Sequence, residues 1–304
     1  MKRTRLTAAV TALLIMIMSF AACAASDTPA ENSDIYRFED YQSSDLFDIE
    51  SVELSSEYAQ KCNTYRFTYM CDGFRIKAYI SIPLSAVKSQ KPYKCIMLNH
   101  GGNRNTGILE DDTTAMVCSA CDRVVVGSQY RGCGGSEGED HFGGDDLNDV
   151  IRLIDLCDSR FAFIDMDDFC VIGASRGGVM TYPAARKDKR IKRIIALSAV
   201  SDLVEAYNSR EDMKRVLKDT IGCTPQEDPA EYEKRSAIYW ADEITIPVLM
   251  FHSKMDAQVS YQQAEQLYEK LKQVTDCTLI SYDDDLHSTL HPGDAQIIND
   301  WLNK

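Results

Sequence analysis

The sequence has few basic residues for its length. Its 304 residues include 33 Lys and Arg against 47 Asp and Glu, which gives a formal net charge of −14 at pH 7. Nucleic-acid backbones and anionic lipid surfaces both repel a surface of that sign. The composition therefore argues against a nucleic-acid-binding protein and against electrostatic docking on an anionic membrane.

The sequence also lacks the ligand spacing of a metal site. Cys118 and Cys121 form a Cys-x-x-Cys pair, but no second pair of this kind and no nearby histidine accompanies it. A structural zinc site needs four such ligands. We therefore expect packing at a helix end for this pair, and neither a metal nor another cofactor for the protein.

Eleven cysteines would suit a disulfide framework in an exported protein. Their positions favour free thiols instead, because cysteine inside an apolar element behaves as a small hydrophobe. Cys62 and Cys71 stand at the two ends of a predicted strand, and their spacing leaves a disulfide between them open. The cysteines that fall within predicted core elements are Cys95, Cys157, Cys170 and Cys277.

The N-terminus has the pattern of an export signal. Basic residues among positions 2–5 precede an apolar run over residues 6–20, which is too short for a membrane-spanning helix. This order predicts a secretory signal peptide over residues 1–22. Phe20-Ala21-Ala22-Cys23 resembles a bacterial lipobox, which implies that Cys23 is lipidated and holds an outward-facing lipoprotein at the cell membrane. Plain cleavage after Ala22 or Ala24, giving a secreted soluble protein, is the alternative.

The rest of the chain divides into two parts. Residues 23–50 are rich in Ser, Asp, Glu, Thr and Pro, a composition that predicts a flexible tether. Residues 51–304 are long enough for one large domain with a sizeable core. No internal repeat divides this second part.

Two patterns of apolar residues predict the fold. Alternating apolar residues over 65–69 and 74–82 flank an Asp72-Gly73 turn, which indicates an antiparallel hairpin. Short continuous apolar runs follow, typical of strands buried on both faces of a parallel sheet; they cover residues 95–98, 124–126, 170–172, 194–197, 248–251 and 278–280. Helical patterns separate the runs, so we predict an α/β fold with a mostly parallel, doubly wound sheet. Ser201–Ile244 is polar and helix-prone, and we interpret it as a small insertion.

One motif suggests a nucleophile. Val171-Ile172-Gly173-Ala174-Ser175-Arg176-Gly177-Gly178 contains Gly-x-Ser-x-Gly between an apolar stretch and helix-forming residues. A strand–turn–helix of this kind holds a catalytic serine out on a sharp, strained bend. A helix-capping serine in an ordinary turn gives the same short pattern. The prediction that Ser175 is a nucleophile therefore depends on its partners.

An acyl-transfer serine needs a base to accept its proton and an acid to orient that base. In α/β-hydrolases the chain order is Ser, acid, His. Asp256 follows the apolar run 248–251, at the carboxyl end of a predicted parallel strand, where such sheets place their sites. His287 follows the next run, 278–280. We predict Asp256 as the acid and His287 as the base.

The other histidines fit the role of base less well. His291 also follows the acid, but it precedes Pro292 and is typical of a turn residue. Of the remaining three, two precede the serine and one lies at a strand end among packing residues; they are His100, His141 and His252.

The oxyanion of an acyl-transfer reaction needs two backbone N–H donors. One would come from Arg176, directly after the serine, and the other from the loop that follows an early strand. His100-Gly101-Gly102-Asn103 follows the run 95–98, and its glycines let the main chain approach a substrate carbonyl closely. We predict the N–H groups of Gly102 and Arg176 as the oxyanion hole.

From about Tyr65 to the C-terminus, the chain resembles the catalytic domain of the prolyl oligopeptidase (S9) family. The resemblance implies an α/β-hydrolase fold, the triad Ser175, Asp256 and His287, and Gly102 and Arg176 as oxyanion donors. The motifs that carry it are Tyr130-Arg131-Gly132-Cys133-Gly134-Gly135, Phe142-Gly143-Gly144-Asp145-Asp146-Leu147-Asn148-Asp149-Val150, Cys223-Thr224-Pro225, Arg235-Ser236-Ala237-Ile238-Tyr239-Trp240-Ala241 and Ile246-Pro247.

The resemblance implies a serine hydrolase that forms an acyl-enzyme and acts on peptides, and the N-terminal pattern predicts that it is exported. A carboxylesterase that removes acetyl, feruloyl or other small acyl groups is the alternative, and a non-catalytic binding lipoprotein is a third. Only a leader and a tether precede the predicted domain, so the β-propeller that filters peptides in full-length members is not expected. Arg176 replaces an aromatic residue common after the serine, and Asn103 a frequent proline. These departures leave peptide and ester substrates open.

Overall fold

The computed structural model describes residues 37–89 and 91–304. The predicted signal peptide, the predicted lipid attachment at Cys23 and residues 24–36 of the predicted tether lie outside the described residues. Within the described part of the chain, no helix combines the length and the apolar character needed to cross a membrane.

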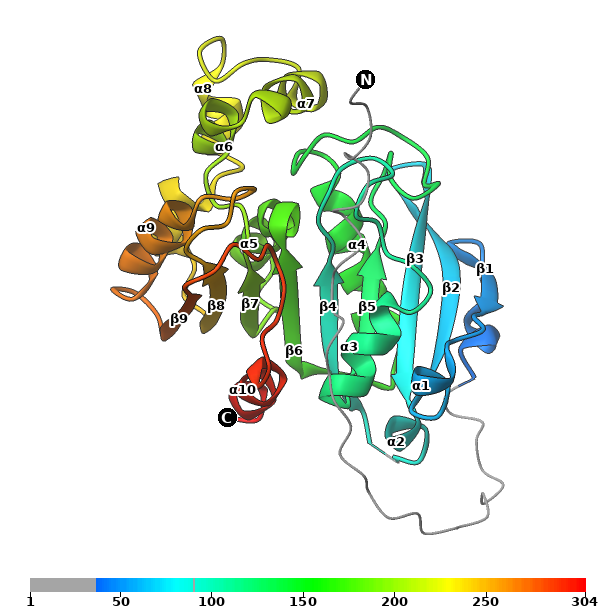
Figure 1. Cartoon of the computed structure of the whole chain (residues 1–304). Helices are drawn as coiled ribbons and strands as arrows, with labels where there is room; N and C mark the ends of the chain where they lie inside the picture. The colour runs from blue at the N-terminus through cyan, green and yellow to red at the C-terminus, as the bar shows by residue number, and fades with distance from the viewer. Residues whose placement is uncertain (1–36, 90) are drawn as a thin grey trace, which may run out of the picture.

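A nine-stranded sheet in the order β1-β2-β3-β5-β4-β6-β7-β8-β9 forms the centre of the fold (Figure 1). The first three strands pair antiparallel, and β3 also pairs antiparallel with β5. All pairs from β5 to β9 are parallel, as the continuous apolar runs predict. The strands are β1 (Leu46–Ser51), β2 (Cys62–Cys71), β3 (Phe74–Pro83), β4 (Tyr93–Asn99), β5 (Val124–Ser128), β6 (Ile164–Ala174), β7 (Arg193–Leu197), β8 (Val248–Ser253) and β9 (Cys277–Tyr282).

The predicted hairpin is confirmed. Cys71 at the end of β2 faces Phe74 at the start of β3. Between them Asp72 and Gly73 both have positive φ angles, of 51° and 84°. This is the conformation that a two-residue hairpin turn requires and that Asp-Gly adopts readily.

Helices cover both faces of the sheet because alternate strand residues point to opposite sides. In β4, Cys95 and Met97 belong to one buried cluster, and Ile96 and Leu98 to the other. The first face packs against α4 (Leu147–Ser159), α5 (Gly178–Lys187) and α9 (Tyr261–Leu271). The second packs against α3 (Thr113–Cys121) and α10 (Asp294–Leu302). Two short helices, α1 (Ser56–Ala59) and α2 (Leu84–Val87), lie near the hairpin.

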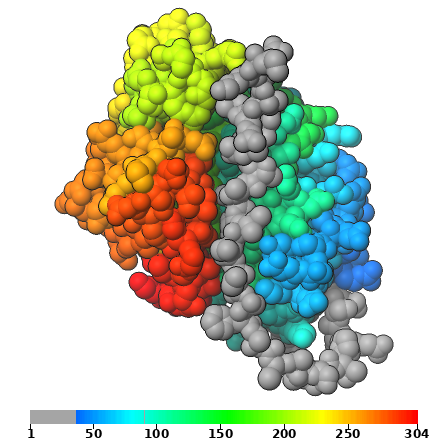
Figure 2. Space-filling view, in the orientation of Figure 1, coloured from blue at the N-terminus to red at the C-terminus, as the bar shows by residue number. Residues whose placement is uncertain are grey.

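The predicted insertion follows β7 and forms a helical lobe at the top of Figures 1 and 2. Its own apolar cluster includes Leu203, Leu217 and Tyr232, and it packs on Val179 of α5 and Val259. Since it follows β7, the lobe stands beyond the carboxyl ends of the parallel strands. The lobe contains α6 (Leu203–Ser209), α7 (Glu211–Ile221) and α8 (Pro229–Glu233). The rest of the insertion, η4 (Ala237–Tyr239) and η5 (Ala241–Glu243), packs on α9 and the main core.

The prediction of a flexible tether through residue 50 is wrong for residues 37–50. They form a 3-10 helix, η2 (Phe38–Tyr41), and strand β1, which pairs with β2. Phe38 is fully buried, with its ring centroid 5.2 Å from that of Phe67 and 5.1 Å from that of Phe161. Burying such a side chain contributes roughly 1.5–3 kcal/mol. A few apolar residues therefore fix this segment despite its polar composition.

The disulfide left open between Cys62 and Cys71 is excluded by the fold. These residues are the first and the last of β2, and an extended strand of that length separates them by far more than the ~7 Å that a disulfide can span. Every cysteine among the described residues is a free thiol. Cys118 is buried on α3, and the described residues contain no metal-ligand cluster around it or elsewhere.

Candidate active site

Ser175 stands at the junction between a strand and a helix. Strand β6 ends at Ala174, a 3-10 turn, η3 (Ser175–Gly177), follows, and α5 begins at Gly178. Ser175 has a φ of +54°, which an L-residue with a side chain rarely adopts. This strained turn is the arrangement that the Gly-x-Ser-x-Gly motif predicts.

Gly177 lets the turn sit tightly against the neighbouring strand. A Cβ atom at this position would lie 2.1 Å from the carbonyl oxygen of Asn99, the last residue of β4. No side chain can occupy that space without moving the backbone. The second glycine of the motif is therefore required by the close approach of two backbones.

Asp256 lies just after β8 and is buried. Its Oδ1 accepts hydrogen bonds from the backbone N–H groups of Gln258 (2.8 Å) and Val259 (3.1 Å). Its Oδ2 lies 2.7 Å from Nδ1 of His287. Burial alone would raise the pKa of Asp256, but the hydrogen bonds from His287 and the backbone outweigh it and lower the pKa below its ordinary value. The carboxylate is therefore ionised at neutral pH and able to orient the imidazole.

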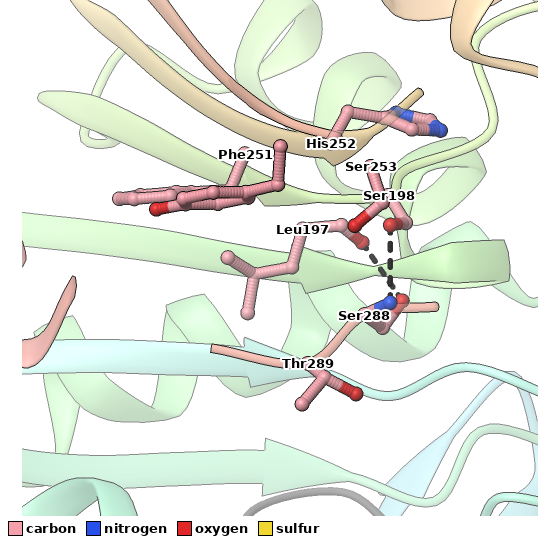
Figure 3. Close-up of a pocket in the computed structure, with 8 residues that line it drawn as sticks. Leu197, Ser198, Phe251, His252, Ser253, Ser288 and Thr289 are labelled. Carbon is pink, nitrogen blue, oxygen red and sulfur yellow. Dashed lines mark hydrogen bonds between the residues drawn. The ribbon is translucent and has the colours of Figure 1, made fainter. Parts of the chain in front are cut away.

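His287 is held through its neighbour Ser288. The Ser288 N–H donates to Ser198 Oγ (3.0 Å), and the Ser288 hydroxyl donates to the carbonyl of Leu197 (3.0 Å), at the end of β7 (Figure 3). These two bonds fasten the loop after β9 to the end of β7.

The same segment also fastens the serine. The N–H of Val200, shortly after β7, donates to the carbonyl of Ser175 (2.9 Å). Since β6 and β7 are neighbours in the sheet, residues 197–200 connect the turn of Ser175 with the loop of His287. The structure thus brings the three predicted triad residues to one edge of the sheet.

The described residues contain no hydrogen bond between Ser175 and His287. His287 Nε2 lies instead 3.5 Å from Ser288 Oγ. In unliganded enzymes, catalytic hydrogen bonds are often long and tighten only when substrate binds. We therefore expect the Ser175–His287 contact to form in the substrate complex.

The predicted oxyanion loop lies against the serine. A Cβ atom on Gly101 would lie 3.1 Å from Ser175 Cβ and 3.7 Å from Ser175 Oγ. Gly102 has a φ of +68°, and a Cβ there would lie 1.8 Å from the carbonyl oxygen of Thr106. The loop can therefore take this course only with glycine at position 102.

The remaining histidines have partners of their own, although Nε2 of His252 also lies 3.6 Å from Oδ2 of Asp256. His252 is buried and contacts the carbonyl of Val259 through Nε2 at 2.9 Å. His291, predicted as a turn residue, pairs with Asp284 at 2.6 Å and stacks on Tyr282. His141 lies 3.8 Å from Asp145 near the surface.

His100 is a buried neutral histidine beside the oxyanion loop. Its Nδ1 lies 2.7 Å from the Gly101 carbonyl, and its ring stacks on Tyr130 with centroids 4.3 Å apart. Burial, with a further contribution from the Arg176 cation, lowers the pKa of His100 to about 4. The imidazole is therefore uncharged over the physiological pH range.

Acid should destabilise the protein through His100. An unfolded histidine has a pKa of about 6.5, so between that pH and about pH 4 protons bind the unfolded chain in preference. The stability that His100 contributes is complete above pH 6.5 and lost as pH falls, by about 2 kcal/mol between pH 7 and pH 5. Urea unfolding at both pH values measures this, and His100→Gln should lose about 2 kcal/mol less than the wild type. Equal losses in both proteins would contradict the assignment.

The sequence does not reveal the role of the Arg176 side chain. Its guanidinium is buried and pairs with Asp140 (2.5 Å) and Asp146 (2.8 Å). A buried arginine needs carboxylate partners. The arginine inside an apolar strand–helix junction could therefore have indicated that a buried ion pair lies next to the serine. Asp146 belongs to the acidic motif 142–150, but nothing in that motif points to Arg176.

A strained serine, a histidine paired with a buried aspartate, and a glycine loop at one edge of a mostly parallel sheet are features of a serine hydrolase with an α/β-hydrolase fold. The sequence model of the prolyl oligopeptidase family, Peptidase_S9, matches residues 111–300. The chain belongs to this family.

Individual proteins agree with this assignment. YtmA, an uncharacterized peptidase of Bacillus subtilis (strain 168), is 30% identical over 217 residues, which are 71% of this chain and 82% of YtmA. Acylaminoacyl peptidase of Pyrococcus horikoshii superposes with a TM-score of 0.64 at 20% identity, over 75% of this chain and 38% of the peptidase chain. Acetyl xylan esterase 1 of a Thermoanaerobacterium species superposes with a TM-score of 0.61 at 16% identity, over 84% of this chain and 86% of its own. This chain thus spans about two fifths of the acylaminoacyl peptidase, and the two structural likenesses show the shared fold.

Proposed function

We propose that the protein hydrolyses peptides through an acyl-enzyme, with Ser175 as nucleophile, His287 as base and Asp256 as the group that orients the base. The observation that carries the proposal is the 2.7 Å contact between His287 Nδ1 and Asp256 Oδ2. It leaves Nε2 free to accept the serine proton. The family and the peptidase relative support peptides as the substrate class.

In the proposed reaction, Ser175 Oγ attacks the substrate carbonyl carbon while its proton moves to His287 Nε2. The carbonyl oxygen becomes an oxyanion that accepts hydrogen bonds from the N–H groups of Gly102 and Arg176. The imidazolium then gives its proton to the departing amine, which leaves an acyl group on Ser175. Water, activated by His287, releases the acid and restores the serine.

An esterase on the same machinery is the alternative. The acetyl xylan esterase shares the fold over 86% of its own chain, and one triad can cleave either bond. Function is decided by the substrate pocket and not by the fold.

A fluorophosphonate probe and a substrate panel test the proposal. The probe should label the folded protein, and mass spectrometry should place the label on the peptide that contains Ser175. Aminoacyl-nitroanilides should be hydrolysed, whereas acetyl and feruloyl esters should be turned over only where the substrate pocket accepts the acyl group. Turnover of esters alone would select the esterase. Folded protein that takes no label would overturn the hydrolase mechanism.

A further inference from the structure

The side chain of Arg176 lies in the wall of the proposed oxyanion hole. Arg176 follows the proposed nucleophile directly, and its side chain is 2% exposed. The mechanism uses only its backbone N–H. The charged group therefore needs an explanation of its own, because burying a charge is costly unless it is fully paired.

The guanidinium reaches the glycine loop directly. Its Nη1 donates to the carbonyl of Gly102 (3.3 Å) and to Asp140 Oδ2 (2.8 Å). Its Nη2 donates to Asp140 Oδ1 (2.5 Å) and to Asp146 Oδ2 (2.8 Å). One side chain thus joins the residue after the nucleophile to Gly102, the other proposed oxyanion donor.

Asp140 makes a second connection to the same loop. Its Oδ2 accepts a hydrogen bond from the N–H of Arg104 (3.2 Å), and its Oδ1 accepts one from the N–H of Phe142 (3.0 Å). The loop that carries Gly102 is therefore held at two points, at Gly102 by Arg176 and at Arg104 by Asp140.

Aromatic rings fix the plane of the guanidinium. The centre of the Arg176 guanidinium lies 4.7 Å from the ring centroid of Phe142 and 5.5 Å from that of Tyr130. The Tyr130 hydroxyl donates to the carbonyl of His100 (3.3 Å), at the start of the loop. The two terminal nitrogens of the planar guanidinium make these bonds in different directions, whereas the single ammonium of lysine cannot make the same set of bonds.

We propose that Arg176 is a positioning residue for the oxyanion hole: through Gly102 and Asp140 it fixes the Gly101–Arg104 loop so that the Gly102 N–H meets the developing oxyanion. This inference rests on the proposed function. Its effect should appear in the transition state and not in substrate binding, because the oxyanion exists only there.

Arg131 provides a matched control. It is another buried arginine, 3% exposed, that bonds two carboxylates, Asp149 (2.8 Å) and Asp72 (2.7 Å). Among the described residues, none of its hydrogen bonds or ion pairs goes to the glycine loop or to Ser175. Replacing it should reduce stability in the same way without moving the oxyanion donors.

The experiment compares Arg176→Lys with Arg131→Lys in the full-length protein. We expect Arg176→Lys to lower kcat by about 10- to 100-fold with KM within about threefold, since complete loss of one donor costs about 10²–10³. The inhibition constant of a trifluoromethyl ketone, whose adduct with the serine carries the oxyanion, should rise in proportion. Arg131→Lys should keep kcat within about threefold despite a similar fall in Tm.

Asp140→Asn is the second variant if Arg176→Lys does not fold, because it keeps the size of the side chain and removes one acceptor. It should lower kcat in the same direction while KM stays within the same limits. Wild-type kcat in the folded Arg176 or Asp140 variant, or equal losses in the Arg131 variant, would overturn the positioning role.

The nucleophile variant Ser175→Ala, run in the same assay, separates the two proposals. If it keeps full turnover, the proposed function fails, and if it loses turnover, only the positioning role is at stake.

Discussion

Replacing Ser175 by alanine should lower kcat by roughly 10⁶-fold, because the attacking oxygen is gone and only the oxyanion donors remain to accelerate the reaction. The fold should be kept, since the hydroxyl has no hydrogen bond among the described residues and alanine faces the same φ of +54°. The measurement is steady-state kinetics on the best substrate of the panel, with Tm recorded in parallel.

Ser201→Ala is the control for this experiment. Ser201 is a buried serine, and its hydroxyl donates to the carbonyl of Gln263 (3.2 Å) and not to any predicted triad residue. Its loss should reduce stability by about 1 kcal/mol and leave kcat within about threefold. A folded Ser175→Ala protein that still takes the fluorophosphonate and turns over substrate would refute Ser175 as the nucleophile.

Replacing His287 by alanine should reduce kcat by roughly 10⁵–10⁶-fold, because the serine then has no base and the leaving amine has no acid. Asp256 alone cannot substitute, since a carboxylate is a weaker base than an imidazole and accepts the serine proton poorly. Pre-steady-state acylation should slow by the same factor, because proton transfer accompanies the attack.

His291→Ala is the control, because this histidine lies in the same loop and has its own carboxylate partner, Asp284. Loss of that pair and of the stacking on Tyr282 should reduce stability while kcat stays within about threefold. The opposite pattern, inactive His291→Ala and active His287→Ala, would assign the base to His291.

The sheet can be predicted from the sequence because burial on both faces leaves a local signal. Runs such as 124–126 and 194–197 are apolar at every position and became β5 and β7. The hairpin follows from period-2 alternation and the Asp72-Gly73 turn. The candidate triad can be chosen for a related reason: in a parallel sheet, residues just after successive strands meet at one edge, so Asp256 and His287 share a neighbourhood although they lie 31 residues apart.

The partners of the Arg176 side chain cannot be predicted in this way. Asp140 and Asp146 lie 36 and 30 residues before it, in a segment without the hydrophobic periodicity that predicts a helix or a strand. The sequence contains many acidic residues, and only the folded structure shows which two of them pair with Arg176. The same limit explains residues 37–50, where Phe38 and Leu46 stand among polar residues and gain their stabilising contacts only from distant rings and from the edge of β2.

Strand β1 determines where a recombinant form of the protein can begin. It covers the outer edge of β2, and Phe38 fills a gap between rings of the core. A shortened protein that starts at residue 51 would leave the ten residues of β2 as an open edge, which invites strand pairing between molecules. Such a preparation would aggregate, and its low activity would be mistaken for a weak catalyst. Recombinant protein for kinetics should therefore begin upstream of Phe38.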